Sequence, residues 1–561
     1  MMSEYSIIPR RQAFSRAQAT IQTLALALCL AGLLSSCGNN SMDRALAGIS
    51  EEHLKAHVEY LAGDACDGRL PFTVGADRAV RYLSEQLEAL GLQPIDGKTY
   101  LQQVPLVQIR TEVPEYVEVS TPGGAARLAE KKDISLFTQS LAPELDIREA
   151  RLFFAGYGIV APEYGKNDYQ GLADPENQIA VVFVNDPGLG RQDSYFRGDT
   201  MTYYGRWTYK YEEGARQGLK GVLIIHDDRG AGYGWSVVGA SDVRFALDGQ
   251  ADEGCPLRGW LSQTAARDLL ARCGYDLDAL KEQAKRPDFK PFALDAKLSV
   301  HLRSTFERAE SPNVVGYIQG ETDESVVCTA HWDHLGHAAE PVAGDSIING
   351  ASDNATAMAW LLETARAFKA LGKTPRRNIV FLFPTCEEKG MFGSAYYAAH
   401  PPFPIEKTAA VVNMDVYPLW GENNDLTITG YGYSDLDSLV APLAAEQGRY
   451  VMPDPEAYNG MFYRSDHLPF MRRGVPAMFA KGWNDNRLRG KEWSKEAVAR
   501  YWAETYHKPS DQTAPEDDYS GLKQETELFF KLIHRLAYSD FRPRWREGAE
   551  FSASSRSPSS N

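Results

Sequence analysis

The sequence predicts an α/β fold, a mostly parallel sheet flanked by helices, with a smaller β-rich domain inserted into it. Three observations lead to this fold class. From Asn313 onward, short apolar segments alternate with segments of helical periodicity, which is typical of strands and helices in turn. The strand candidates are continuous apolar runs, as in parallel sheets buried on both faces. Between about 150 and 291 the pattern changes to apolar segments joined by turn residues.

The C-terminal part supplies most elements of the predicted sheet. Apolar residues repeat at helical spacing from Met358 to Phe368, and a closing helix is expected around 525–538. Strands are expected at 314–318, 326–330, 379–383, 409–412 and 476–480. Polar residues that follow such strands lie at the carboxyl edge of the sheet, where open α/β sheets place their sites.

The inserted domain is expected to span 150–291. Its strand candidates are 152–155, 179–184 and 222–225, separated by turns rich in Gly, Pro and Asp. The segment 201–211 is unusually aromatic, and we expect most of these rings to form the core of the insert, with one or two facing a cleft. Before the insert, two helices flank a turn-rich loop at 67–73, whose core reads Gly-Arg-Leu.

The N-terminus has the features of an export signal. Basic residues precede the apolar run 24–34, which is too short to span a bilayer as a stable anchor. The run leads into Leu-Ser-Ser-Cys-Gly, which resembles a bacterial lipobox and predicts lipid anchoring on Cys37 in the cell envelope. A cleaved secretory signal is the alternative. The expected organisation is a signal peptide at 1–37, the N-terminal part of the main domain at 38–149, the insert at 150–291, the main domain at 292–549 and a disordered tail at 550–561.

Composition excludes one class of partner. The 561 residues carry a formal net charge of −16, which argues against nucleic acid, since phosphate binding needs a basic face. The seven cysteines have no C-x-x-C spacing, so they are not expected to bind metal. Cys255 and Cys273 are close enough in sequence for a disulfide in an oxidising compartment, but two buried thiols are an equal alternative.

Acidic and imidazole residues follow several of the expected strands. Two imidazoles and four carboxylates suit two zinc ions and one general base. The six residues are His331 in Ala-His-Trp-Asp-His-Leu-Gly, Asp353 in Gly-Ala-Ser-Asp-Asn, the pair Glu387 and Glu388, Asp415 in Asn-Met-Asp, and His507 in Tyr-His-Lys-Pro-Ser-Asp.

Together these motifs resemble peptidase family M28, the zinc aminopeptidases and carboxypeptidases. The resemblance is strong from about 313 to 511, and the insert is similar to the protease-associated domain of some members. It implies the zinc exopeptidase fold, with His331, Asp353 and Asp415 on one Zn²⁺ and Glu388, Asp353 and His507 on the other. Mn²⁺ or Co²⁺ are alternative occupants, since affinity alone does not select the metal.

The resemblance also assigns two residues that do not bind metal. Glu387 is the general base that activates a metal-bound water, and Asp333 holds the second nitrogen of His331. His334 and His337 are expected to serve loop packing and solvent contact. Cys386 stands where Gly or Ala is more familiar, which predicts sensitivity of the activity to oxidation or thiol reagents.

Two further residues of the motifs are weighed and set aside. His467, in Arg-Ser-Asp-His, competes with His507 for the last ligand position, and the sequence around His507 fits that position better. Tyr463 is treated as a packed side chain.

The predicted function is that of a dinuclear zinc exopeptidase acting on peptides, with aminopeptidase action preferred. Carboxypeptidase action is the nearest alternative, because the ligands are shared. A non-catalytic peptide-binding lipoprotein and a single-zinc aminoacyl cyclase are two others, and the complete ligand set argues against both.

Overall fold

The structure is a computed structural model that describes residues 41–239, 243–342 and 344–552. The predicted signal peptide with Cys37, and the tail from residue 553, lie outside these residues. Within the described ranges, no helix combines the length and apolar character needed to cross a membrane. The ordered chain extends past the predicted start of the tail at 550, because Phe551 is buried, with its ring 5.3 Å from that of Tyr203.

The predicted α/β class is confirmed by a central sheet with parallel strands at its core. Continuous apolar runs form these strands because both faces are covered. In spatial order the parallel strands are β17 (Asn378–Phe383), β14 (Ser325–Thr329), β18 (Thr408–Asn413) and β21 (Ala477–Lys481). At one side the end of β13 (Phe292–Ile318) pairs antiparallel with β17, and at the other β19 (Asp425–Ile428) pairs antiparallel with β21 and parallel with β20 (Tyr450–Pro453).

Helices cover both faces of this sheet. Alternate strand residues enter different cores, since Val326 packs in one cluster and Val327 in the other. The first face carries α2 (Glu51–Leu61), α3 (Val74–Ala89), α8 (Thr356–Leu371), α10 (Leu436–Glu446) and α13 (Ser520–Tyr538). The second carries α9 (Phe392–Ala399) and α11 (Leu468–Arg472), and α12 (Gly490–Arg500) follows later in the chain.

The region of the predicted insert contributes a second set of parallel strands to the same extended sheet, and it contains helices as well as strands. The strands β6 (Glu144–Phe154), β9 (Gln178–Phe183), β10 (Gly221–Ile225) and β12 (Leu257–Leu261) are parallel, and β5 (Ile134–Phe137) is antiparallel to β12. Its helices are α4 (Trp207–Arg216), α5 (Asp228–Ala231), α6 (Gln263–Arg272) and α7 (Leu277–Ala284). Tyr203, Tyr209 and Tyr211 of the aromatic segment are buried.

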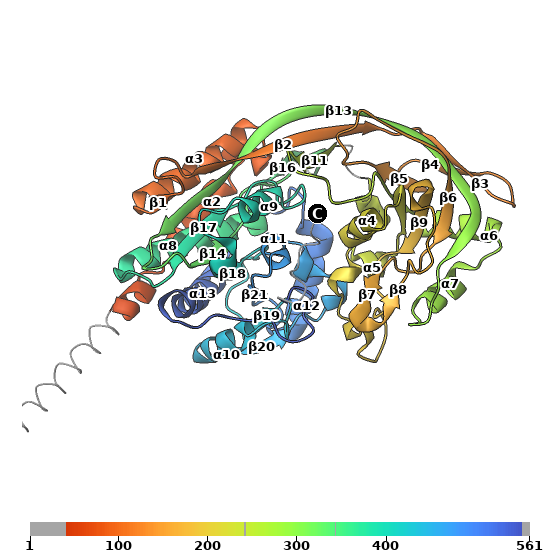
Figure 1. The fold of residues 1–561 in the computed structure, drawn as a ribbon. Helices are drawn as coiled ribbons and strands as arrows, with labels where there is room; N and C mark the ends of the chain where they lie inside the picture. The colour runs from red at the N-terminus through yellow and green to blue at the C-terminus, as the bar shows by residue number, and fades with distance from the viewer. Residues whose placement is uncertain (1–40, 240–242, 343, 553–561) are drawn as a thin grey trace, which may run out of the picture.

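A long curved strand joins the two parts. β13 runs for 27 residues and arches over the molecule in Figure 1, with β2 (Leu101–Glu112) beside it. It pairs with β6 and β3 (Tyr116–Ser120) on the insert side and with β17 on the main side. The remaining strands are β1 (Gln93–Pro94), β4 (Ala126–Ala129), β7 (Val160–Ala161), β8 (Lys166–Asn167), β11 (Val243–Leu247), β15 (Gly336–Val342) and β16 (Asp345–Ile348).

The cysteines of the described ranges are free thiols. Cys255 and Cys273 are both free, so the disulfide is not formed. Cys255 is buried but Cys273 is only partly buried, so the alternative of two buried thiols holds for Cys255 alone.

Candidate metal centre

The structure brings the predicted ligands together at the carboxyl ends of the parallel strands. His331 follows β14, Glu387 and Glu388 follow β17, and Asp415 follows β18. Asp353 lies in the single turn Ala351–Ala355 that precedes α8. His507 comes from the segment after α12, so one ligand reaches the site from outside the sheet edge.

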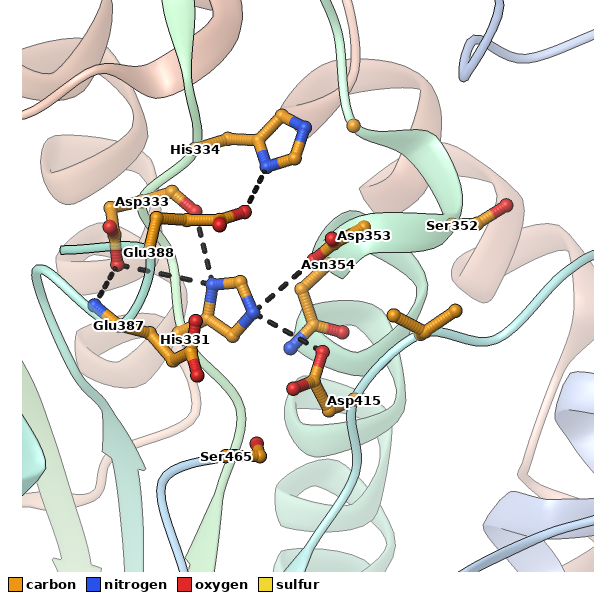
Figure 2. A network of polar contacts seen from close by, with 12 residues as sticks. His331, Asp333, His334, Ser352, Asp353, Asn354, Glu387, Glu388, Asp415 and Ser465 are labelled. Carbon is orange, nitrogen blue, oxygen red and sulfur yellow. Dashed lines mark hydrogen bonds and ion pairs between the residues drawn. The ribbon is translucent and has the colours of Figure 1, made fainter. Parts of the chain in front are cut away.

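The first group of ligand atoms surrounds one point. His331 Nε2 is 3.3 Å from Asp353 Oδ1 and 3.3 Å from Asp415 Oδ1. Figure 2 shows the imidazole pointing between these two carboxylates. Zinc bonds of about 2.1 Å in tetrahedral geometry separate two ligand atoms by about 3.4 Å. The observed separations therefore fit a shared zinc ion.

The second group shares Asp353 with the first. His507 Nε2 is 3.2 Å from Asp353 Oδ2 and 3.3 Å from Glu388 Oε2. The two oxygens of Asp353 thus face different imidazoles, which is the arrangement of a carboxylate that bridges two cations. Asp353 Oδ1 and His507 Nε2 are buried atoms without a hydrogen-bond partner in the described part of the chain. Buried polar atoms are normally satisfied, so this observation also fits a metal.

His334 is nearer to the site than its predicted role in loop packing and solvent contact allows. It is fully buried, and its Nδ1 is 2.7 Å from Glu388 Oε1 (Figure 2). One ligand-type atom each from His334, Asp353 and Glu388 lies within 4.8 Å of the others. Solvent contact is therefore wrong for His334, which is fully buried. His337 is half exposed and bonds to Asp67 at 2.8 Å.

Charge interactions at the site favour protonated imidazoles and ionised ligand carboxylates. Burial alone would lower the pKa of His507, but Glu388 and Asp353 raise it to about 10. The pKa of His331 is likewise well above its usual value, because Asp415 and Asp353 outweigh burial. Burial opposes ionisation of Asp353, yet its pKa lies well below the usual range because the imidazoles of His331 and His507 lie 3.3 and 3.2 Å from its oxygens. A divalent cation in each site would displace the imidazole proton and add one further positive charge among these carboxylates.

Asp333 acts on the site mainly through different atoms from those predicted. The partner of His331 Nδ1 is the carbonyl oxygen of Asp333, at 3.0 Å, whereas the Asp333 carboxylate lies at 3.9 Å. The same carboxylate accepts a hydrogen bond of 2.9 Å from the backbone N–H of Glu387. Asp333 therefore orients both the imidazole and the segment that carries Glu387.

Glu387 lies beside the ligands in a half-buried position. Burial raises its pKa well above the usual value, and Asp415, Asp466 and Glu388 add to the rise while His331 opposes it. Cys386, the residue before Glu387, has a φ of +54° in the left-handed region. Glycine adopts this conformation most readily, which explains why it suits this position. The Cys386 thiol is fully buried and burial raises its pKa, so the structure argues against its predicted sensitivity to thiol reagents.

Several site residues were not identified from sequence. Asp511 accepts from the backbone N–H groups of Ser352 (2.9 Å) and Asp353 (3.1 Å) and so fixes the predicted bridging residue. Lys481 donates to the carbonyl of Asp415 at 2.8 Å. Their types and positions at strand or loop ends were visible, but their partners were not.

The two set-aside residues bond to groups other than the candidate ligands. His467 is buried with its Nε2 2.8 Å from the carbonyl oxygen of Phe462, so the structure favours His507. Tyr463 is buried against Tyr433, with 2.8 Å between the hydroxyls, as a packed tyrosine should be.

An α/β sheet with two carboxylate–imidazole groups at its carboxyl edge is an arrangement that metal-dependent hydrolases use. Residues 313–532 match the family model for Peptidase family M28, so the chain contains a domain of this family.

Known proteins share parts of the sequence and the fold. Leupeptin-inactivating enzyme 1 of Streptomyces exfoliatus is 30% identical over 135 residues, 24% of this chain and 29% of that protein. A vacuolar membrane protease of Aspergillus flavus is 29% identical over 117 residues, 19% of this chain and 12% of that protein. The chain thus spans well under half of these relatives. The solved aminopeptidase from Aneurinibacillus sp. strain AM-1 has the same fold, with a TM-score of 0.50 and 19% identity over 89% of this chain and 96% of that one.

Proposed function

We propose that the protein is a dinuclear zinc exopeptidase that removes N-terminal residues from peptides. The observation that carries the proposal is the carboxylate of Asp353, whose oxygens lie 3.3 Å from His331 Nε2 and 3.2 Å from His507 Nε2. His331, Asp353 and Asp415 would hold one zinc, and Glu388, Asp353 and His507 the other. Mn²⁺ or Co²⁺ suit the same nitrogen and oxygen donors.

Zinc, when bound, polarises the scissile carbonyl and lowers the pKa of a water molecule. Glu387 accepts the proton of the attacking water and passes it to the leaving amine. Burial supports this role because it raises the pKa of Glu387 and makes the carboxylate a stronger base. Asp333 holds the backbone of Glu387 and the ring of His331, so it positions both.

Aminopeptidase action is supported by the excess of acidic groups. Beyond the three ligand carboxylates, Glu387, Asp333 and Asp466 lie at or beside the site, and burial raises the pKa of each. A substrate ammonium group beside them would favour their ionised form. Asp466 is fully buried, and both its oxygens are without a hydrogen-bond partner among the described residues.

One observation favours the carboxypeptidase alternative. Burial and the neighbouring charge of Arg464 lower the pKa of Arg206 to about 9. The Nε atoms of both arginines are buried and have no hydrogen-bond partner in the part of the chain that is described. Arg464 lies close enough to Tyr506, the residue before His507, for that phenol to act on its pKa. A substrate carboxylate would complement such a pair of cations.

The deciding experiment compares four substrates with the zinc-loaded protein. Leucine anilide is paired with its N-acetylated form, and an N-blocked dipeptide is paired with its C-terminal amide. Cleavage of the free-amine anilide alone supports aminopeptidase action. Cleavage of the N-blocked dipeptide alone supports the alternative, and inactivity on all four with two zinc ions bound contradicts both.

Location follows from features of the sequence. The segment 1–37 supports export, with lipid attachment on Cys37 and a membrane-anchored enzyme in the cell envelope. Mass spectrometry of the N-terminal peptide from the native host would detect a diacylglyceryl group on Cys37. A mature chain that begins elsewhere without lipid would support the secretory alternative.

The insert is proposed to act as a protease-associated domain that covers the cleft and selects substrates.

A further inference from the structure

The Gly-Arg-Leu segment of the N-terminal part packs against the loops that carry the candidate metal ligands. Arg69 in this segment is fully buried, with 0% of its surface exposed. Each of its five N–H groups donates to a backbone carbonyl. The acceptors are Trp332 (2.9 Å), Leu61 (2.7 Å), Asn349 (2.6 Å), Gly350 (3.0 Å) and Asp353 (3.2 Å).

One of these acceptors belongs to a candidate ligand, and another lies next to one. Trp332 lies between His331 and Asp333, and the Asp353 carbonyl belongs to the residue that bridges the two groups. Asn349 and Gly350 lead directly to Asp353. One rigid, planar group therefore joins the loop after β14 to the loop before α8.

The backbone around Arg69 fits closely against both loops. Gly68 has a φ of +65°, and a Cβ there would lie 2.3 Å from the carbonyl oxygen of Gly336 and 2.8 Å from that of Ile348. The carbonyl of Arg69 accepts a hydrogen bond of 3.2 Å from the N–H of His334. The segment is thus held on the same two loops from its main chain as well as from its side chain.

Burying a guanidinium that bonds only to carbonyls costs free energy, so the filling of space alone does not explain Arg69. Burial lowers the pKa of Arg69, and the nearby carboxylates Asp353, Asp511 and Asp333 oppose this. No ion pair links Arg69 to a carboxylate within the described residues. A lysine would keep the charge, but its three N–H groups radiate from one atom and cannot reach five carbonyls.

We propose that Arg69 is a positioning residue for the metal centre: it fixes the loops of His331 and Asp353 relative to each other and so sets the zinc affinity. The inference rests on the proposed zinc function. It makes the centre depend on a segment outside the matched domain 313–532.

The experiment measures zinc dissociation constants by competition with a fluorescent chelator for the wild type, Arg69→Lys and a matched control, Arg377→Lys. Arg377 is also buried and donates to carbonyls, among them Ser539 (3.0 Å) and Phe541 (2.8 Å), but it precedes β17 at the opposite edge of the sheet. Both variants should lower the melting temperature of the metal-free protein. Only Arg69→Lys should weaken zinc binding, by about 10- to 100-fold.

Equal zinc affinity in Arg69→Lys and the wild type would overturn the proposal, as would an equal loss in both variants. A wild type that binds no zinc would instead refute the proposed function. If Arg69→Lys does not fold, Asn349→Ala tests the same connection. Asn349 donates from its side chain to the Ala62 carbonyl (2.8 Å) and to Asp64 (3.0 Å). Its loss should weaken zinc binding by about tenfold, and an unchanged affinity would overturn the proposal.

Discussion

Zinc affinity should rise steeply with pH, because each metal site must lose a proton before its imidazole can bind. The pKa of His507 is raised to about 10, so at pH 7 only about one molecule in a thousand has a neutral His507 ring. Removing that proton costs roughly 4 kcal/mol, from about 1.4 kcal/mol per pH unit. The pKa of His331 in the other site is also well above its usual value.

The sign of the effect follows from the direction of these shifts. A histidine with a raised pKa stabilises the metal-free fold fully below its unfolded pKa of about 6.5. For His507 that contribution is lost as the pH rises towards about 10. The metal-free protein should therefore lose stability between pH 7 and 10, whereas zinc-dependent stabilisation should grow over the same interval.

The assay is isothermal titration calorimetry between pH 6 and 8, in buffers of different ionisation enthalpy. We expect one proton released per zinc and an apparent dissociation constant that falls about tenfold per pH unit at each site. In His507→Gln, one of the two sites should lose its proton release together with most of its affinity. Zinc binding that is independent of pH in the wild type would show that the imidazoles are already neutral and would refute the reasoning.

Three further predictions test single residues. Glu387→Gln should bind zinc like the wild type but lose about 10²- to 10⁴-fold in kcat, and retention of full activity would exclude Glu387 as the base. Metal analysis of the Asp353→Asn variant should find one zinc instead of two, because an amide does not offer a carboxylate oxygen to each site. Two tightly bound ions in this variant would contradict the bridging role. In native protein, Ellman's reagent should leave Cys386 unmodified and react with the partly exposed Cys273. Inactivation by modification of Cys386 would contradict this prediction, because it would show that the thiol becomes accessible.

Local sequence was enough to predict the sheet and the positions of most candidate ligands. β14, β17 and β18 are apolar on both faces, so a continuous run of apolar residues was enough to predict each strand. Because parallel strands end at one edge, polar residues directly after them had to converge. The roles of His331 and Glu388 were nevertheless assigned through the family resemblance.

The predictions were less accurate where a residue's partner is distant or its direction depends on a turn. His334 follows His331 by three residues, and whether it faces solvent or Glu388 depends on loop dihedral angles that composition does not fix. The hydrogen-bond partner of His331 Nδ1 is a backbone carbonyl oxygen. Because every residue has such a carbonyl, the residue type could not predict this contact. The helices of the insert were obscured because its strands and turns dominate the pattern.

Arg69 shows most clearly why the geometry of such a metal centre can be predicted only in part from its sequence motifs. Its acceptors on the ligand loops lie 263 to 284 residues further along the chain, and all are main-chain oxygens. The motifs record which atoms can bind a metal, because those atoms belong to particular side chains. They do not record what holds the atoms 3.2 to 3.3 Å apart, because that depends on backbone groups contacted from far away. A metal site is selective only when its geometry is fixed, so the chemistry of this centre depends on a segment that carries none of its ligands.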